Sequence, residues 1–64
     1  MMVLFPWRQL ALGSRVLVKS KDTFQAGIVM RFGKNRAERT IVWVELDGVE
    51  KPIPAWNIYR ENET

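Results

Sequence analysis

The chain has 64 residues, of which 47% are hydrophobic and 27% charged, and its formal net charge is +3. This length suits a single small domain, and the composition is that of a folded globular protein rather than a disordered one. Cysteine and histidine are absent, which excludes disulfides, thiol nucleophiles, imidazole bases and the usual ligands of zinc. We therefore expect a protein without metal or cofactor that is not an enzyme.

The N-terminal segment, residues 1–12, is expected to form an apolar arm. Its apolar run ends at Trp7, so it is about a third of the ~20 residues that a membrane span requires. Arg8 follows this run instead of preceding it, which is unlike a secretory signal. We therefore expect a cytoplasmic protein with no membrane partner. The arm would either pack across an open end of the domain or mediate oligomerisation.

Apolar residues that alternate with a period of two predict a first strand in which Val16 and Val18 point inward. A second strand is predicted over residues 24–32. Its even positions are all apolar, so we expect them, including Phe24 and Phe32, to face the core.

The third predicted strand covers residues 40–46 and repeats this alternation. Val42 and Val44 share its inner face, and Trp43 lies on the opposite face. Asp47-Gly48 comes next and is a strong signal for a two-residue hairpin, because that turn needs positive φ at both central residues. The sequence therefore predicts that this strand is joined by a tight turn to the one after it.

The fourth predicted strand, residues 49–53, lies beside two prolines that cannot donate to a sheet, so it should be at an edge or end there. Residues 54–57 suit one turn of 3₁₀ helix before a last short strand over residues 58–60. Residues 61–64 are expected to be a frayed tail.

Five short strands with tight turns are typical of a small antiparallel barrel, so residues 13–60 are predicted to be an all-β, five-stranded barrel. The pattern that leads to this prediction consists of Leu12-Gly13, Val16, Val18, Gly27 to Val29, Val44 to Gly48, Ile53-Pro54 and Ile58. It resembles the Src-homology-3-like barrels, a group that includes Tudor, KOW and retroviral-integrase C-terminal domains. This resemblance implies a fold with one 3₁₀ turn before the last strand, and it implies no particular activity.

Residues 13–32 also resemble one member of this group. The matching residues are Gly13-Ser14-Arg15-Val16, Lys19-Ser20, Phe24 to Val29 and Phe32. They look like the first half of the type II dihydrofolate reductases, which are borne on plasmids and integrons. The resemblance implies a bacterial mobile element as the source, and a homotetramer whose central pore binds dihydrofolate and NADPH.

The pore of that family is lined by a Val-Gln-Ile-Tyr segment and by a lysine just before the Lys-Ser pair. Here Glu50-Lys51-Pro52-Ile53 and Val18 occupy the matching positions. A glutamate repeated by symmetry would repel two polyanionic ligands, and Pro52 removes a backbone donor. We therefore expect the barrel without the reductase activity, and a divergent reductase-like oligomer is kept as an alternative.

Basic residues concentrate in the middle of the chain and acidic ones near its end. The predicted nucleic-acid-binding residues are Arg31, Lys34, Arg36 and Arg39 on the second hairpin and its loop, Lys21 on the first loop, and Trp43. Long basic side chains can meet successive phosphates, and an indole can stack on a base. The leading hypothesis is a non-enzymatic binding module for DNA, RNA or another anionic partner.

Other interpretations of these residues stay open. The basic residues can be an ordinary solvated surface, and Trp43 can be covered by Phe5 or Trp7. Trp56 can cap the barrel, or it can join the N-terminal arm in docking another protein. This last possibility makes a protein adaptor the remaining alternative function.

Overall fold

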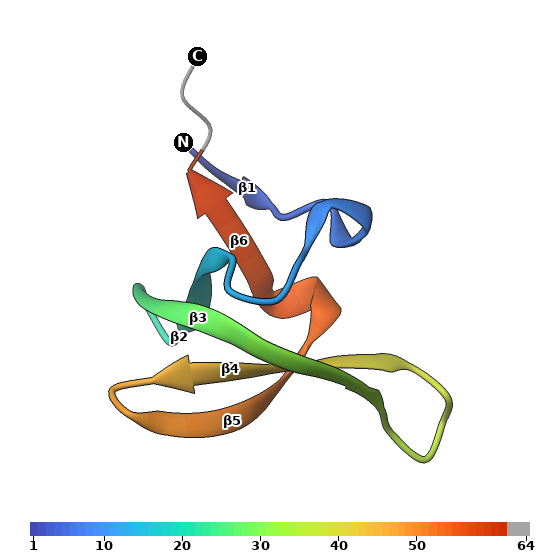
Figure 1. Ribbon diagram of the computed structural model, residues 1–64. Coiled ribbons are helices and arrows are strands. Elements are labelled where there is room, and N and C mark those ends of the chain that lie inside the picture. Colours follow the sequence, from blue (N-terminus) through green and yellow to red (C-terminus); the bar gives the residue numbers. More distant parts are fainter. Residues whose placement is uncertain (62–64) are drawn as a thin grey trace.

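The computed structural model describes residues 1–61 as an all-β fold of six strands and two short 3₁₀ helices (Figure 1). The elements are β1 (Met2–Leu4), η1 (Trp7–Gln9), β2 (Arg15–Ser20), β3 (Thr23–Lys34), β4 (Thr40–Leu46), β5 (Val49–Pro54), η2 (Ala55–Asn57) and β6 (Ile58–Glu61). The all-β prediction is confirmed. Neither helix in this part of the chain is long and apolar enough to cross a membrane.

The described strands form one antiparallel sheet in the order β1-β6-β2-β3-β4-β5. The five strands expected in residues 13–60 are present as β2 to β6, but part of the expected arm forms a sixth strand, β1, which pairs with β6 through Val3↔Arg60 and its neighbours. Three consecutive apolar residues show no alternation, so the sequence pattern missed this strand. Within residues 1–61, β1 and β5 are the end strands and no pairing joins them, so hydrogen-bonded strands do not close the sheet into the expected barrel.

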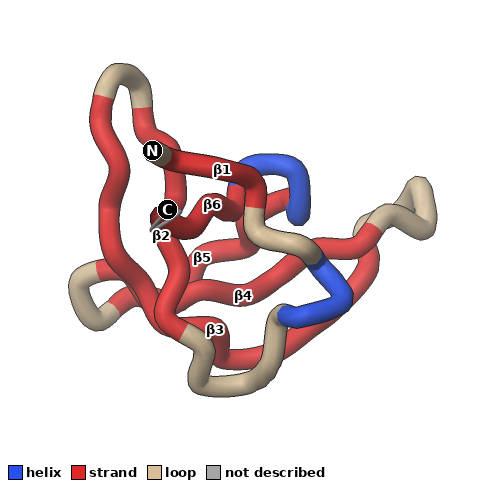
Figure 2. Tube along the Cα trace, turned by 90° about the horizontal axis from the view of Figure 1, so that it is seen from above, coloured by secondary structure: helices blue, strands red, loops and turns tan. Residues whose placement is uncertain are grey.

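The 3₁₀ turn predicted before the last strand is confirmed as η2. The N-terminal segment contains a second 3₁₀ helix, η1, which the sequence did not predict. Of the expected tail, Glu61 is the last residue of β6, and residues 62–64 lie outside the described part. Figure 2 shows the loop between β3 and β4 projecting from the sheet, toward the end of the molecule where η1 and η2 also lie.

The hairpin between β4 and β5 follows the prediction. Asp47 and Gly48 have φ of 52° and 80°, the positive values that the tight turn requires. Because residues flanking such a turn form a hydrogen-bonded pair and the pairs then alternate, Pro52 and Pro54 fall at positions whose N–H would point away from β4. The prolines therefore preserve the pairing with β4 and remove donors from the free edge of β5.

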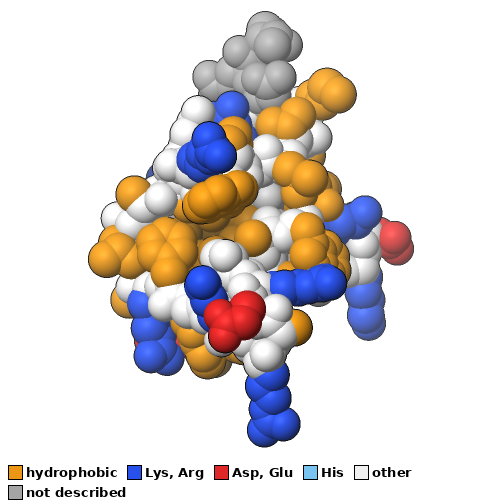
Figure 3. All heavy atoms as spheres, turned by 90° about the vertical axis from the view of Figure 1, so that its right-hand side faces the viewer, with side chains coloured by type: hydrophobic (Ala, Val, Ile, Leu, Met, Phe, Trp, Pro, Cys, Tyr) orange, Lys and Arg blue, Asp and Glu red, His pale blue; other side chains and the backbone are white. Residues whose placement is uncertain are grey.

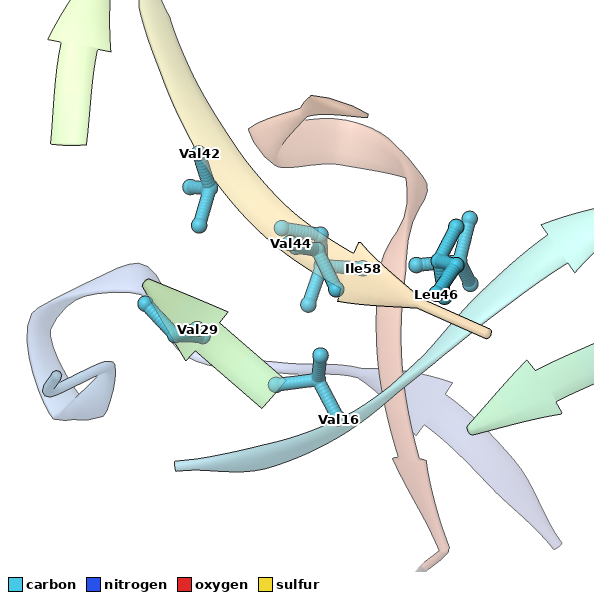
Figure 4. Packing of buried hydrophobic residues seen from close by; sticks show 7 residues of the cluster. Val16, Val29, Val42, Val44, Leu46 and Ile58 are labelled. Carbon is cyan, nitrogen blue, oxygen red and sulfur yellow. The ribbon is translucent and has the colours of Figure 1, made fainter. Parts of the chain in front are cut away.

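The core is formed by apolar side chains from β2, β3, β4 and β6 (Figure 4). The buried residues are Val16, Val18, Val29, Val42, Val44, Leu46 and Ile58. Most are β-branched, a type that suits strands. The burial of the valines confirms the inward positions predicted for β2 and β4. Phe5 and Leu10 from the N-terminal segment and Ile53 from β5 pack against this core.

The face predicted for the second strand is wrong. Gly27 and Val29 are buried, whereas Phe32 is 46% exposed. A Cβ on Gly27 would lie 2.8 Å from the carbonyl oxygen of Glu45, so β3 and β4 approach each other where a glycine gives no hydrophobic signal. A β-bulge after Val29 then shifts the register.

Candidate nucleic-acid interface

The long strand β3 separates the predicted binding residues into two groups. Lys21 lies in the turn before β3, whereas Lys34 ends that strand and Arg36 and Arg39 follow in the loop to β4. Figure 1 shows these two turns at opposite ends of β3. The structure thus brings the three hairpin residues together and leaves Lys21 apart from them.

Asn35 organises the loop between β3 and β4. Its Oδ1 accepts hydrogen bonds from the backbone N–H groups of Ala37 at 2.8 Å and of Arg39 at 3.1 Å. Its own backbone N–H donates to the carbonyl of Arg39 at 3.0 Å. Asparagine suits this role because its short amide mimics a backbone turn. The loop is therefore held in a defined shape that presents Arg36 at its tip.

The basic side chains of this hairpin are exposed. Lys34 Nζ lies 4.0 Å from a carboxylate oxygen of Glu38, and both side chains are largely in solvent, so the pair is weak. Within residues 1–61 neither Arg36 nor Arg39 forms an ion pair. Figure 3 views this end of the molecule and shows basic side chains around an apolar surface.

Arg31 and Trp43 are engaged with each other on the outer face of the sheet. Arg31 Cζ lies 4.3 Å from the centroid of the Trp43 ring. The Nε of Arg31 donates a hydrogen bond to Glu50 Oε1 at 3.2 Å. Trp43 is accordingly half-buried, and the side chain found over its ring is Arg31. These two predicted site residues form a cross-strand cluster with Glu50 rather than a free indole beside a free cation.

A first hollow lies at the base of the hairpin, on the side of η1, and we call it the Trp7 hollow. It has a volume of about 460 Å³ and is lined by Trp7, Arg8, Leu10, Phe32, Gly33, Lys34 and Thr40. The Trp7 side chain is 62% exposed, and Arg8 Cζ lies 5.6 Å from its ring centroid. Phe32 is the strand partner of the core residue Val42, but Phe32 itself is exposed and lines this hollow. This hollow therefore combines two exposed rings with two cations.

A second hollow, the Trp56 hollow, lies on the side of η2. It has a volume of about 510 Å³ and is lined by Asn35, Arg39, Thr40, Ile41, Pro54, Ala55 and Trp56. Trp56 is 67% exposed. Thr40 lines both hollows, so they are neighbours at the base of the hairpin.

Sequence reasoning missed the contribution of Trp7, Arg8 and Phe32 to this region. The alternation in β3 predicts Phe32 in the core, because it gives the wrong inner face for that strand. The apolar run ending at Trp7 predicts only an arm, although an aromatic residue beside a basic one is a usable signal for stacking. For Trp56 the sequence suggests a barrel cap or a protein-docking residue, and no local pattern indicates that it lies near Arg39.

The residues at the reductase pore positions have other surroundings here. Val18 is buried in the core. Glu50 is the partner of Arg31 on the edge strand β5, and Lys51 and Pro52 are exposed beside it.

Comparison of the chain with protein-family models, with curated proteins and with solved structures finds no match. The similarity to Src-homology-3-like barrels and to type II dihydrofolate reductases stays a prediction from the sequence. Residues 1–61 contain no group of three or more carboxylate, imidazole or thiol side chains placed to hold a metal ion.

Proposed function

We propose that the protein binds nucleic acid through the end of the molecule formed by the β3–β4 hairpin and its two hollows. The observation that supports this is that cations and exposed aromatic rings lie together there. The cations are Arg8, Lys34, Arg36 and Arg39, and the rings are Trp7, Phe32 and Trp56. Cations neutralise phosphates and flat rings offer surfaces for bases, so this combination suits a nucleic acid better than a simple anion.

We also propose that β2 to β6 act as a small barrel of the Src-homology-3-like kind and serve as a non-enzymatic scaffold for this surface. In support, β6 returns to β2 through Leu17↔Tyr59 and Val18↔Ile58. The 3₁₀ helix η2 directly precedes β6. A solved structure in which β2 to β6 form a flat sheet open on one face would contradict this fold.

Fluorescence anisotropy with labelled DNA and RNA oligonucleotides, between about 50 mM and 200 mM salt, tests the function. We expect the logarithm of the binding constant to fall linearly with the logarithm of the salt concentration. Arg36→Glu should weaken binding, because it reverses a charge at the tip of the hairpin. Lys21→Glu is the matched control, since it makes the same charge change at the other end of β3 and should have a much smaller effect.

Two results would contradict the proposal. One is the absence of binding to any oligonucleotide at about 50 mM salt, where phosphate contacts are strong. The other is an equal loss of affinity in Arg36→Glu and Lys21→Glu, which would show a response to net charge and not to this surface.

A further inference from the structure

We propose that the ligand is single-stranded, with unpaired bases stacked on Trp56 and Trp7 and the phosphate backbone crossing the base of the hairpin between them. This inference rests on the proposed function and specifies its substrate class. It is carried by the two hollows, each of which has an exposed indole, and by the cations that line them.

Each hollow contains an indole ring that is exposed to solvent. Trp56 and Trp7 are 67% and 62% exposed and neither belongs to the buried core. A base in a duplex presents only its edge to a groove, because its faces are covered by neighbouring bases. A ring-lined hollow can therefore take a base by stacking only when that base is unpaired, and stacking tolerates any sequence.

Each hollow is also lined by at least one cation. Arg39 lines the Trp56 hollow, and Arg8 and Lys34 line the Trp7 hollow. Each stacked base would thus have a cation close to its phosphate. Thr40 borders both hollows. A nucleic-acid strand that occupies both hollows would therefore cross the base of the hairpin over Thr40, whose side chain is small.

The size of each hollow suits a single base. The hollows, about 460 and 510 Å³, lie within the ~300–1,000 Å³ range of sites that enclose small molecules. Each can hold a planar base with part of its sugar. A double helix is too wide to enter such a hollow, so its paired bases would not reach the indole rings.

The test compares a labelled oligothymidine of about 12 nucleotides, a length typical of single-strand-binding barrels, with a duplex of the same length. We expect tighter binding of the single strand. Trp56→Ala should weaken that binding by about 5- to 150-fold, the usual effect of losing one stacked base, and Trp7→Ala should act in the same direction. Neither substitution should change the salt dependence, whereas Arg39→Gln, which removes one phosphate contact, should reduce its slope by about 0.7 for a single strand.

Matched variants separate stacking from folding. Trp56→Phe keeps a flat ring and should retain more affinity than Trp56→Leu, which keeps apolar volume without a ring. Trp43→Phe is the control for a general loss of indole, because the Trp43 ring is already covered by Arg31, and it should bind like the parent protein. Far-ultraviolet circular dichroism, which reports backbone structure, together with the urea midpoint of each variant checks that the sheet is intact.

The outcomes distinguish the two proposals. If single strand and duplex bind equally and Trp56→Ala has no effect while Arg36→Glu does, the inference fails and the nucleic-acid function stands. If neither form binds, both fail. If a polyglutamate peptide binds as tightly as the oligothymidine, the surface recognises acidic proteins and the inference is overturned.

Discussion

The core and the hairpin end of the molecule use apolar side chains in opposite ways. The core between β2, β3, β4 and β6 is filled mainly by valines and holds no buried polar side chain within the described residues. At the hairpin end, larger apolar groups such as Phe32, Trp7 and Trp56 remain in contact with solvent. Burial is thus decided by position in the fold and not by the size of the side chain.

This difference indicates where stability and binding reside. A ring that stays exposed contributes little to folding, because only area removed from water is stabilising. Exposed rings beside cations are instead available for a ligand. Substitutions in the core should therefore change folding, and substitutions at the hairpin end should change binding.

The sharpest comparison is between Ile58→Ala and Phe32→Ala. Ile58 is fully buried, so its truncation should lower the free energy of unfolding by about 2–5 kcal/mol. A chain of this length has about 3–10 kcal/mol in total, so much of the stability would be lost. Phe32→Ala removes more atoms but should cost only about 1 kcal/mol, because the ring is half exposed. Urea denaturation measures both, and equal losses would show that the hairpin end is part of the core.

A second comparison uses two glycines of β3. A Cβ at Gly27 would lie 2.5 Å from Val44 Cγ1 and 2.8 Å from the Glu45 carbonyl oxygen, so Gly27→Ala forces β3 and β4 apart. We expect a loss of about 1–3 kcal/mol in the free energy of unfolding. Gly33→Ala is the control, since its Cβ would lie 3.5 Å from Trp43 Nε1, an ordinary contact. Similar thermal melting of the two variants would contradict the close packing at Gly27.

The sequence predicted the elements well and their burial less well. Asp47-Gly48 and the prolines of β5 act through local backbone geometry, so the hairpin and the edge strand could be read directly. The inner face of β3 could not be predicted in this way, because Gly27 has no side chain that would mark it as buried and the bulge after Val29 changes the register.

The candidate site also has a part that the sequence predicts and a part that it does not. The basic hairpin was visible because its residues are close in sequence. The two hollows join residues distant in the chain, such as Trp7 with Phe32 and Arg39 with Trp56. Such pairs depend on how β3 extends beyond the core, which no local pattern specifies.

A smaller effect is expected at Asn35, which shapes the loop without contributing charge. Asn35→Ala leaves two backbone N–H groups without their acceptor, which should cost about 1 kcal/mol. Asn35→Asp keeps an acceptor at this position and should retain the stability, while its negative charge weakens oligonucleotide binding. Equal stability of the alanine and parent proteins in urea would show that the loop shape does not depend on this side chain.

The smallest effect is expected in the cluster of Arg31, Trp43 and Glu50. The Arg31 and Glu50 side chains are 61% and 42% exposed, so Glu50→Gln should cost less than about 1 kcal/mol at low salt and less again at high salt. Arg31→Ala should cost more than Glu50→Gln, because it also removes the contact with the Trp43 ring, which is worth about 0.5–1 kcal/mol and is not broken by Glu50→Gln. Denaturation of both variants at two salt concentrations measures this difference. Identical losses that vanish together in high salt would mean that Arg31 is held by Glu50 and not by the indole, in which case Trp43 would be open to a ligand.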